Sequence, residues 1–361
     1  MSLLMNFSDQ RYVKITQMVF EEQFRRDSKL DSEMDERRKR LMYDDVVYNI
    51  SFLMTAVYFE DKRIFEIYAV WLYELLCHLM KDLDRYRIME QMRDHYHILA
   101  EMLSSHGAGL LSEEEMKKAA EYLRLAAKVT EAAVTDVELS PAFLDGRHAD
   151  IRKAYLDALL SNQTRQAYDI IRDARKRGIH VEEIYEDVLK RVMYEIGSLW
   201  HRHVITVDRE HYATSVTQTV MSTFYEEIFD RPRCGRTLLS CAVGSELHEM
   251  GARMLSDLFE YYGWDSVYLG SALPEDSILE AIGEHKPDVV ALSVTMVPYL
   301  ADCEKIVMSI RHRFPWVKIA VGGQAFASTQ DLWTKWDIDF YSASAVDMVH
   351  WAQQEPIRAQ A

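Results

Sequence analysis

One short pattern in this sequence is best suited to hold a metal. It is a histidine with a carboxylate two residues before it and a glycine three residues after it. The segment reads Glu246-Leu247-His248-Glu249-Met250-Gly251 and directly follows a β-rich run. A neutral histidine nitrogen is a common metal ligand, and a carboxylate such as Glu246 on its far ring nitrogen fixes the tautomer and raises ligand basicity. Taken alone, the spacing fits a surface histidine equally well.

Polar residues and glycines follow two later β-rich runs. Ser293 and Thr295 end one run, and Gly322-Gly323 follows the next. In a doubly wound parallel sheet, ligands bind at the carboxyl ends of the strands, and paired glycines let a bulky ligand lie against the backbone. Each feature by itself is ordinary strand-end turn chemistry. A phosphate-binding loop needs a glycine-rich stretch after the first run, and Gly244 alone does not supply one.

Together these residues resemble the signature of the cobalamin (vitamin B12)-binding domain family, which methionine synthase, the B12-dependent mutases and corrinoid proteins share. The resemblance implies a base-off cofactor whose nucleotide tail is buried in the sheet domain. It implies that His248 replaces the benzimidazole as the lower cobalt ligand. Glu246 stands where many members carry Asp. The tunnel for the tail is then lined by five residues, Gly251, Ser293, Thr295, Gly322 and Gly323.

A second set of aromatic and polar residues lies upstream in helical sequence. Trp200-His201 ends one expected helix and Glu210-His211 begins the next, in the spacing Trp-x9-Glu-His. A corner between two helices brings the four side chains to one surface. Taken alone, such a set is more often a core tryptophan beside an exposed Glu-His pair. Next to a cobalamin domain it resembles the adenosylcobalamin photoreceptors of the CarH type.

The photoreceptor resemblance implies roles for these residues. Trp200, Glu210 and His211 are expected over the upper face of the corrin. His201 is the candidate upper cobalt ligand after light breaks the cobalt–carbon bond. Adenosylcobalamin is therefore the favoured cofactor and methylcobalamin the alternative. The resemblance covers residues 150–345, and methyl-carrying relatives have a similar helical cap, so a corrinoid carrier protein of a methyltransferase system stays open.

The helix and strand patterns around these residues predict an α + α/β fold in three parts. Residues 1–145 have helical periodicity and are expected to form a signalling or dimerisation domain. Residues 148–230 are expected to form a four-helix-bundle cobalamin cap. Residues 234–355 alternate strand and helix patterns, which is typical of a doubly wound, Rossmann-like parallel sheet. The cap helices are expected at Ile151–Leu160, Thr164–Arg177, Val181–His201 and Asp208–Phe229, and the strands at Arg236–Val243, Ser266–Leu269, Val289–Val294, Lys318–Val321 and Asp339–Ser342.

The first 145 residues do not follow the photoreceptor pattern. Those proteins carry a short helix-turn-helix of the MerR type, whereas this segment is longer and mixes acidic and basic residues. Ser112 followed by three glutamates indicates a helix start, and Ser140–Gly146 is expected to be a linker. We expect output through a homodimer or a regulatory protein partner.

Composition excludes several classes of function. The chain has 361 residues, 42 of them basic and 58 acidic, and a net charge of −16. An acidic surface repels phosphate backbones, so direct nucleic-acid binding is not expected. No apolar run reaches membrane-spanning length, and no signal peptide is apparent. Four scattered cysteines without a Cys-x-x-Cys pair indicate a reduced, cytoplasmic protein.

The sequence is compatible with three functions. A light-responsive, cobalamin-dependent sensor or regulator is favoured by the Trp-x9-Glu-His set. A corrinoid carrier would make the chain part of a methyl-transfer enzyme system, and a storage protein would need neither role. A mutase is disfavoured because no (β/α)8 barrel is present. The chain is therefore expected to be a sensor rather than an enzyme.

Overall fold

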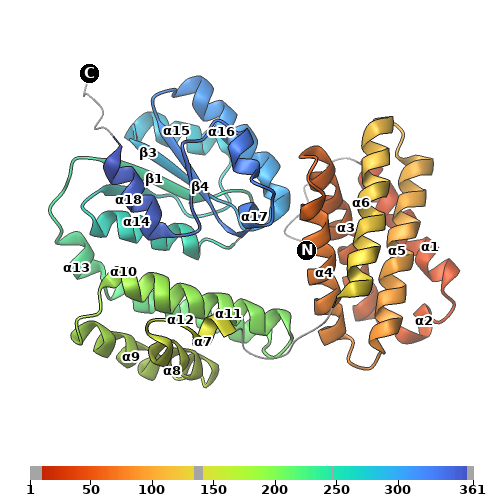
Figure 1. Ribbon diagram of the computed structural model, residues 1–361, viewed down its shortest axis with the longest axis horizontal. Helices are drawn as coiled ribbons and strands as arrows, with labels where there is room; N and C mark the ends of the chain where they lie inside the picture. The colour runs from red at the N-terminus through yellow and green to blue at the C-terminus, as the bar shows by residue number, and fades with distance from the viewer. Residues whose placement is uncertain (1–9, 134–140, 246, 356–361) are drawn as a thin grey trace. The chain divides into compact units, whose positions relative to one another are not determined.

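The computed structural model describes residues 10–133, 141–245 and 247–355, which form two compact units. One unit contains the N-terminal helices together with residues 296–301 and 325–332. The other contains the remaining described residues from 141 onward (Figure 1). No helix within these ranges is long and apolar enough to cross a bilayer.

The N-terminal unit is built of helices whose starts are capped by their own sequence. Asp35, Asp61 and Asp84 accept hydrogen bonds from first-turn backbone N–H groups of α3, α4 and α5. Ser112 and Glu115 form a capping box at α6, which confirms the predicted helix start. The helices are α1 (Gln10–Arg26), α2 (Leu30–Glu33), α3 (Glu36–Tyr58), α4 (Lys62–Leu79), α5 (Arg85–His106) and α6 (Glu113–Ala132).

The cap follows the predicted helices with two differences. The third predicted helix contains a π-helical stretch. The fourth was predicted as one continuous helix from Asp208 to Phe229, which is wrong, because the helix is interrupted at Thr223-Phe224. There the hydroxyl of Thr223 donates to the carbonyl of Val220 at 2.7 Å, a side-chain bond that competes with the helix ladder. The elements are α7 (Pro141–Leu144), α8 (Ala149–Leu160), α9 (Thr164–Lys176), α10 (Val181–Glu183), η1 (Ile184–Leu189), α11 (Lys190–His201), α12 (Val207–Ser222) and α13 (Tyr225–Phe229).

The remaining chain forms a five-stranded parallel sheet in the order β2-β1-β3-β4-β5. This confirms the predicted fold class. The strands are β1 (Thr237–Ala242), β2 (Asp265–Tyr268), β3 (Val289–Ser293), β4 (Lys318–Gly322) and β5 (Phe340–Tyr341). The connecting elements are α14 (Met250–Tyr261), α15 (Glu275–His285), η2 (Val297–Tyr299), α16 (Leu300–Arg313), α17 (Gln324–Ala327), η3 (Leu332–Lys335) and α18 (Ala345–Gln354).

Two tyrosines of the cap bind α14 of the sheet domain. Tyr185 in η1 donates to the Oδ2 atom of Asp257 at 2.9 Å. Arg253, one turn earlier on α14, donates to the hydroxyl of Tyr225 in α13 at 2.7 Å. Because Asp257 is buried, its carboxyl depends on this partner. The cap is thus fixed to the helix that follows the His248 loop.

Asp257 makes stability depend on pH. Burial raises the pKa of Asp257 to about 6. Because the folded-state pKa is raised, the unfolded chain releases this proton first, and the free energy of unfolding falls as pH rises from about 4 to about 6. The Asp257→Asn substitution removes this loss of stability, and the amide oxygen of the asparagine can still accept the hydrogen bond from the Tyr185 hydroxyl. We expect the variant to be about 2 kcal/mol more stable at pH 7.5 and equal to wild type at pH 4, as measured by thermal unfolding.

Asp276→Asn is the matched control, because that aspartate is exposed. It should leave the unfolding temperature nearly unchanged at both pH values. A gain from Asp257→Asn of the same size at pH 4 and pH 7.5 would show that the carboxyl charge is not the cause.

Candidate functional site

The carboxyl ends of three strands lie side by side. Ala242 of β1 is opposite Ser293 of β3, and Ser293 is opposite Gly322 of β4. Backbone hydrogen bonds of 2.9 Å from Val243 to Ser293 and from Val294 to Gly322 continue this register beyond the strands. The strand order reverses beside β1, with β2 on one side and β3 on the other. The edge therefore forms the crevice in which open α/β sheets bind ligands.

His248 lies in the loop between β1 and α14, beside this edge. Its side chain is exposed, and Leu247 next to it is 66% exposed although it is apolar. The loop therefore presents a candidate metal ligand and an apolar side chain together, just before α14 begins. Glu246 lies outside the described residues, so its hydrogen bond to His248 stays a prediction.

The end of β2 holds the His248 loop in place through Glu249. The hydroxyl of Tyr268 donates to the carbonyl of Glu249 at 3.3 Å. The hydroxyl of Ser271 donates to the Oε2 atom of Glu249, also at 3.3 Å. Sequence reasoning missed these positioning residues. The signal that could have found them was a hydroxyl just after the second strand, at the same edge as Ser293.

Glycine stands at positions 322 and 323 for different structural reasons. Gly323 has a φ of +99°, and a Cβ there would lie 2.2 Å from the carbonyl oxygen of Val294. A Cβ on Gly322 would lie 3.0 Å from the carbonyl oxygen of Ser342. The backbone of the sheet edge therefore requires glycine at 323 and crowds any side chain at 322.

Gly251 is different, because a Cβ there would meet no atom within 4 Å. Gly251 is the second residue of α14, and the packing of that helix does not require glycine there. The open surface beside His248 instead fits a large ligand that lies directly against the start of α14, as the buried tail of cobalamin would require.

The residues of the Trp-x9-Glu-His set lie at one helix corner, as expected. Trp200 and His201 end α11, and Glu210 and His211 lie near the start of α12. Trp200 is half-buried against the cap core, whereas His211 is exposed. The carboxyl of Glu210 contacts the Nδ1 atom of His211 and accepts from the hydroxyl of Thr214 at 3.0 Å. The four residues thus lie on the two helix ends that flank one connecting turn.

A buried ion pair fixes the end of α11. The guanidinium of Arg202 donates to the Oε1 atom of Glu195 at 2.9 Å, and both side chains are buried. Burial raises the pKa of Glu195, and the charge of Arg202 opposes that rise. Removing one partner would leave an uncompensated buried charge. The pair thus holds the end of α11, where Trp200 and His201 lie. Sequence periodicity does not predict this ion pair.

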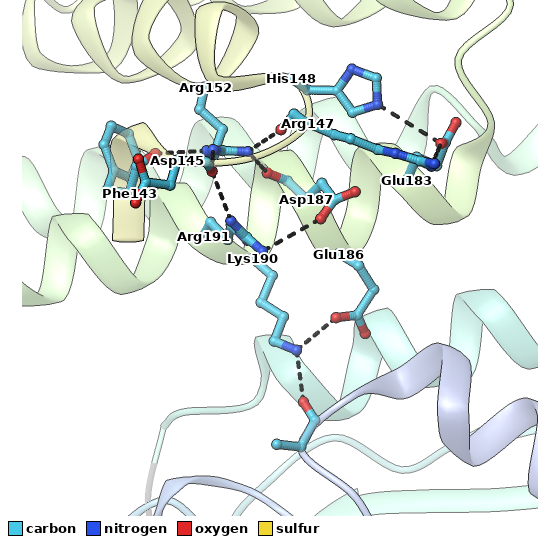
Figure 2. Close-up of polar contacts among 11 residues, drawn as sticks. Phe143, Asp145, Arg147, His148, Arg152, Glu183, Glu186, Asp187, Lys190 and Arg191 are labelled. Carbon is cyan, nitrogen blue, oxygen red and sulfur yellow. Dashed lines mark hydrogen bonds and ion pairs between the residues drawn. The ribbon is translucent and has the colours of Figure 1, made fainter. Parts of the chain in front are cut away.

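The π-helical stretch η1 and the start of α11 bind the segment between β5 and α18 (Figure 2). The carboxyl of Glu186 accepts from the backbone N–H of Ala345 at 2.6 Å. Lys190 donates to the carbonyl of Ala343 at 2.7 Å and to Glu186 at 2.6 Å. One helical turn therefore joins the cap to the sheet domain a second time.

Arg152 joins the same stretch to the segment before the cap. Its guanidinium is fully buried and donates to the carbonyls of Phe143 and Asp187, each at 2.9 Å. It also donates to the carbonyls of Asp145 and Arg147 (Figure 2). A planar, multi-donor guanidinium suits this arrangement better than any other side chain. Arg152 thus connects residues 143–147 to η1.

Comparison with known proteins agrees with this geometry. Two models, each described as a B12 binding domain, match residues 151–225 and 236–347. Trimethylamine corrinoid protein 1 of Methanosarcina acetivorans is 24% identical over 198 residues, covering 54% of this chain and 91% of that protein. The HTH-type transcriptional repressor CarH of Myxococcus xanthus is 26% identical over 219 residues, covering 56% of this chain and 71% of that protein.

A solved structure shares the fold. The monomethylamine corrinoid protein of Methanosarcina barkeri superimposes with a TM-score of 0.50 at 16% identity, covering 56% of this chain and 97% of that one. The matched residues include both the helical cap and the sheet with its His248 loop. The chain therefore binds cobalamin and belongs to the cobalamin-binding protein family, with CarH-type repressors and corrinoid proteins among its relatives.

Proposed function

We propose that this protein is a cobalamin-dependent regulator that responds to light through adenosylcobalamin. The observation that carries the proposal is the helix corner with Trp200, His201, Glu210 and His211. A carrier of a small methyl group has no need of a half-buried tryptophan beside two histidines and a carboxylate. A bulky upper ligand that must be covered, and replaced after it leaves, does need them.

The residues of the site divide between the two faces of the cofactor. His248 would hold cobalt from below, with Glu246 orienting its ring, while Gly251, Ser293, Thr295, Gly322 and Gly323 would line the tail tunnel. Trp200, Glu210 and His211 would cover the upper face, and His201 would occupy the upper position in the lit state. Bound adenosylcobalamin supplies the visible absorption and a light-sensitive cobalt–carbon bond.

The contacts of η1 support an output from the site. Glu186 and Lys190 bind the sheet domain, and Arg152 binds both η1 and residues 143–147. A shift of the cap on the sheet would therefore pull on the chain that leads to the N-terminal unit. We propose a division into a signalling or dimerisation domain (1–145), a cap (148–230) and a cobalamin-binding domain (234–355), with a second copy or a regulatory protein as partner.

A corrinoid carrier is the second candidate. The match to trimethylamine corrinoid protein 1 spans 91% of that protein, so the cap and the sheet alone correspond to nearly a whole corrinoid protein. In this case methylcobalamin is the cofactor and the partner is a methyltransferase. The N-terminal unit then has no assigned role, which is why the regulator is preferred.

We predict that His248→Ala changes the absorption spectrum of bound cobalamin. Loss of the imidazole removes the lower ligand, so the spectrum should shift to that of a weaker axial ligand, with affinity reduced about tenfold or more. His312→Ala is the control, because His312 is exposed on α16 of the same domain. Identical spectra for His248→Ala and wild type would remove His248 as a ligand.

The second prediction concerns light. The full chain loaded with adenosylcobalamin in the dark should change its absorption spectrum under green light. Trp200→Ala and His201→Ala should keep the dark spectrum and alter the photoproduct. Trp316→Ala, at an exposed tryptophan, should behave as wild type.

Two results would contradict the light response. One is an unchanged photoproduct in both cap variants. The other is a bound cofactor that light does not affect, combined with methyl exchange between bound methylcobalamin and a methyltransferase. The second result would assign the protein to the carriers.

The third prediction concerns Arg152. Lysine keeps the charge but cannot bind four carbonyls, so Arg152→Lys should uncouple residues 143–147 from η1. In wild type, hydrogen exchange of these amides should change when cobalamin binds. In the variant that change should be lost, while cobalamin affinity stays within about twofold. Lys153→Met at an exposed neighbour is the control, and a change that persists in Arg152→Lys would contradict the coupling.

A further inference from the structure

Two segments that follow strands of the sheet belong to the N-terminal unit. Residues 296–301 come directly after Thr295, and residues 325–332 begin two residues after Gly323. Thr295 and Gly323 are among the residues that would line the tunnel for the cobalamin tail. The chain therefore passes from the proposed tail site into the N-terminal unit at two separate places.

The second of these segments is held by its own hydrogen bonds and buried side chains. The hydroxyl of Thr329 donates to the carbonyl of Phe326 at 2.7 Å and accepts from the backbone N–H of Leu332 at 3.4 Å. All three residues are buried. A short, internally bonded segment moves as one piece, so a displacement at its start is passed on to its end.

Asp61 binds this segment to the start of α4. Its Oδ1 atom accepts from the backbone N–H of Arg63 at 3.0 Å, which caps the helix. Its Oδ2 atom accepts from the backbone N–H of Gln330 at 2.6 Å. The side chain of Asp61 is only 6% exposed, so water does not readily replace either bond. One carboxylate thus satisfies two backbone donors from distant parts of the sequence.

The turn that carries Asp61 has a defined shape. Only Phe59, Glu60 and Asp61 separate α3 from α4. Glu60 has a φ of +53°, and the backbone N–H of Asp61 donates to the carbonyl of Ala56 at 3.0 Å. This is the arrangement in which a left-handed residue ends a helix. Movement of Asp61 therefore moves the junction of two helices.

The first segment contacts one of the same helices. η2 packs against α3, and Val297 and Leu300 are buried there. The segments after β3 and β4 thus contact α3 and α4, the two helices that Asp61 joins.

We propose that Asp61 is a positioning residue of the cobalamin site, through which the N-terminal unit responds to the bound nucleotide tail. By holding Gln330 it fixes the segment after Gly322-Gly323, and the tail in turn fixes Asp61 at the start of α4. Coupling of this kind is reciprocal, so the tail stabilises the first turn of α4 by the factor by which Asp61 strengthens tail binding. This coupling rests on the proposed tail site at the strand ends and does not require the light response.

The test measures amide hydrogen exchange of the full chain in the dark, with hydroxocobalamin or with cobinamide, which has the corrin ring but no nucleotide tail. Hydroxocobalamin should slow exchange about fivefold or more in residues 323–332 and in residues 62–66 at the start of α4. Cobinamide should leave both regions as they are without a cofactor. Hydroxocobalamin has no alkyl group on cobalt, so a chain that fails the light test can still pass this one.

Substitution of Asp61 separates its two bonds. Asp61→Asn can accept only one of them, because the amide nitrogen is a donor. Asp61→Ser keeps a good helix cap but is too short to bind Gln330 as well. Both variants should lose the slowing at α4 and bind hydroxocobalamin about fivefold or more weakly, with cobinamide affinity within about twofold of wild type. A merely structural defect would weaken both ligands alike.

Two controls keep the relevant groups in place. Asp84 caps α5 through its Oδ1 atom, which accepts from the backbone N–H of Tyr86 at 2.8 Å, and Asp84→Asn retains such an oxygen. Gln330→Ala removes an exposed side chain and keeps the backbone N–H that Asp61 binds. Both variants should match wild type in affinity and in exchange.

Three outcomes would overturn the proposal. Slowing in residues 323–332 without a change in α4 would remove the coupling and leave the tail site in place. Unchanged exchange in residues 323–332 would remove the tail site itself and the coupling with it. Slowing at α4 that persists in both Asp61 variants, or that cobinamide also produces, would assign the effect to a different contact.

Discussion

The attachment of α14 to the cap is the constraint on which the cobalamin site depends. The loop with His248 ends where α14 begins, so the direction of α14 sets the position of His248, the proposed lower cobalt ligand. The other side of that helix is bound by Tyr185 and Tyr225 of the cap. Burial raises the pKa of Asp257, so its charged carboxylate lowers stability at neutral pH, and the hydrogen bond from Tyr185 offsets part of that loss. The same bond fixes η1 of the cap to α14.

The π-helical stretch serves both neighbours of the cap at once. A π-helical turn has i→i+5 hydrogen bonds and is frequently found at functional sites. Here its side chains Tyr185 and Glu186 bind the sheet domain, while the carbonyl of Asp187 accepts from Arg152. A displacement of the cap on the sheet domain and a displacement of residues 143–147 would therefore both involve this short segment. A coupling of this kind acts in both directions, so a partner held by the N-terminal unit would also affect the cofactor site.

Sequence reasoning found the residues that follow strands, because strand ends in a parallel sheet meet at one edge whatever the strand order. It could not give the lateral register of Ala242, Ser293 and Gly322, since periodicity carries no information on neighbouring strands. It assigned both glycines of Gly322-Gly323 to ligand approach, whereas the contact of a Gly323 Cβ with Val294 gives a backbone reason. The partners Asp257 and Tyr185 are 72 residues apart and leave no local pattern.

The N-terminal unit separates a regulator from a carrier more clearly than the cofactor site does. The cap and the sheet match a corrinoid protein over nearly its whole length, so this similarity by itself is compatible with either role. A carrier must present its cofactor to a second active site, and the corrinoid protein matched over 91% of its length corresponds to the cap and sheet without the N-terminal helices. A regulator would need a unit that receives a change at the cofactor. The chain at residues 143–147, which Arg152 binds to η1, continues in sequence to the N-terminal helices.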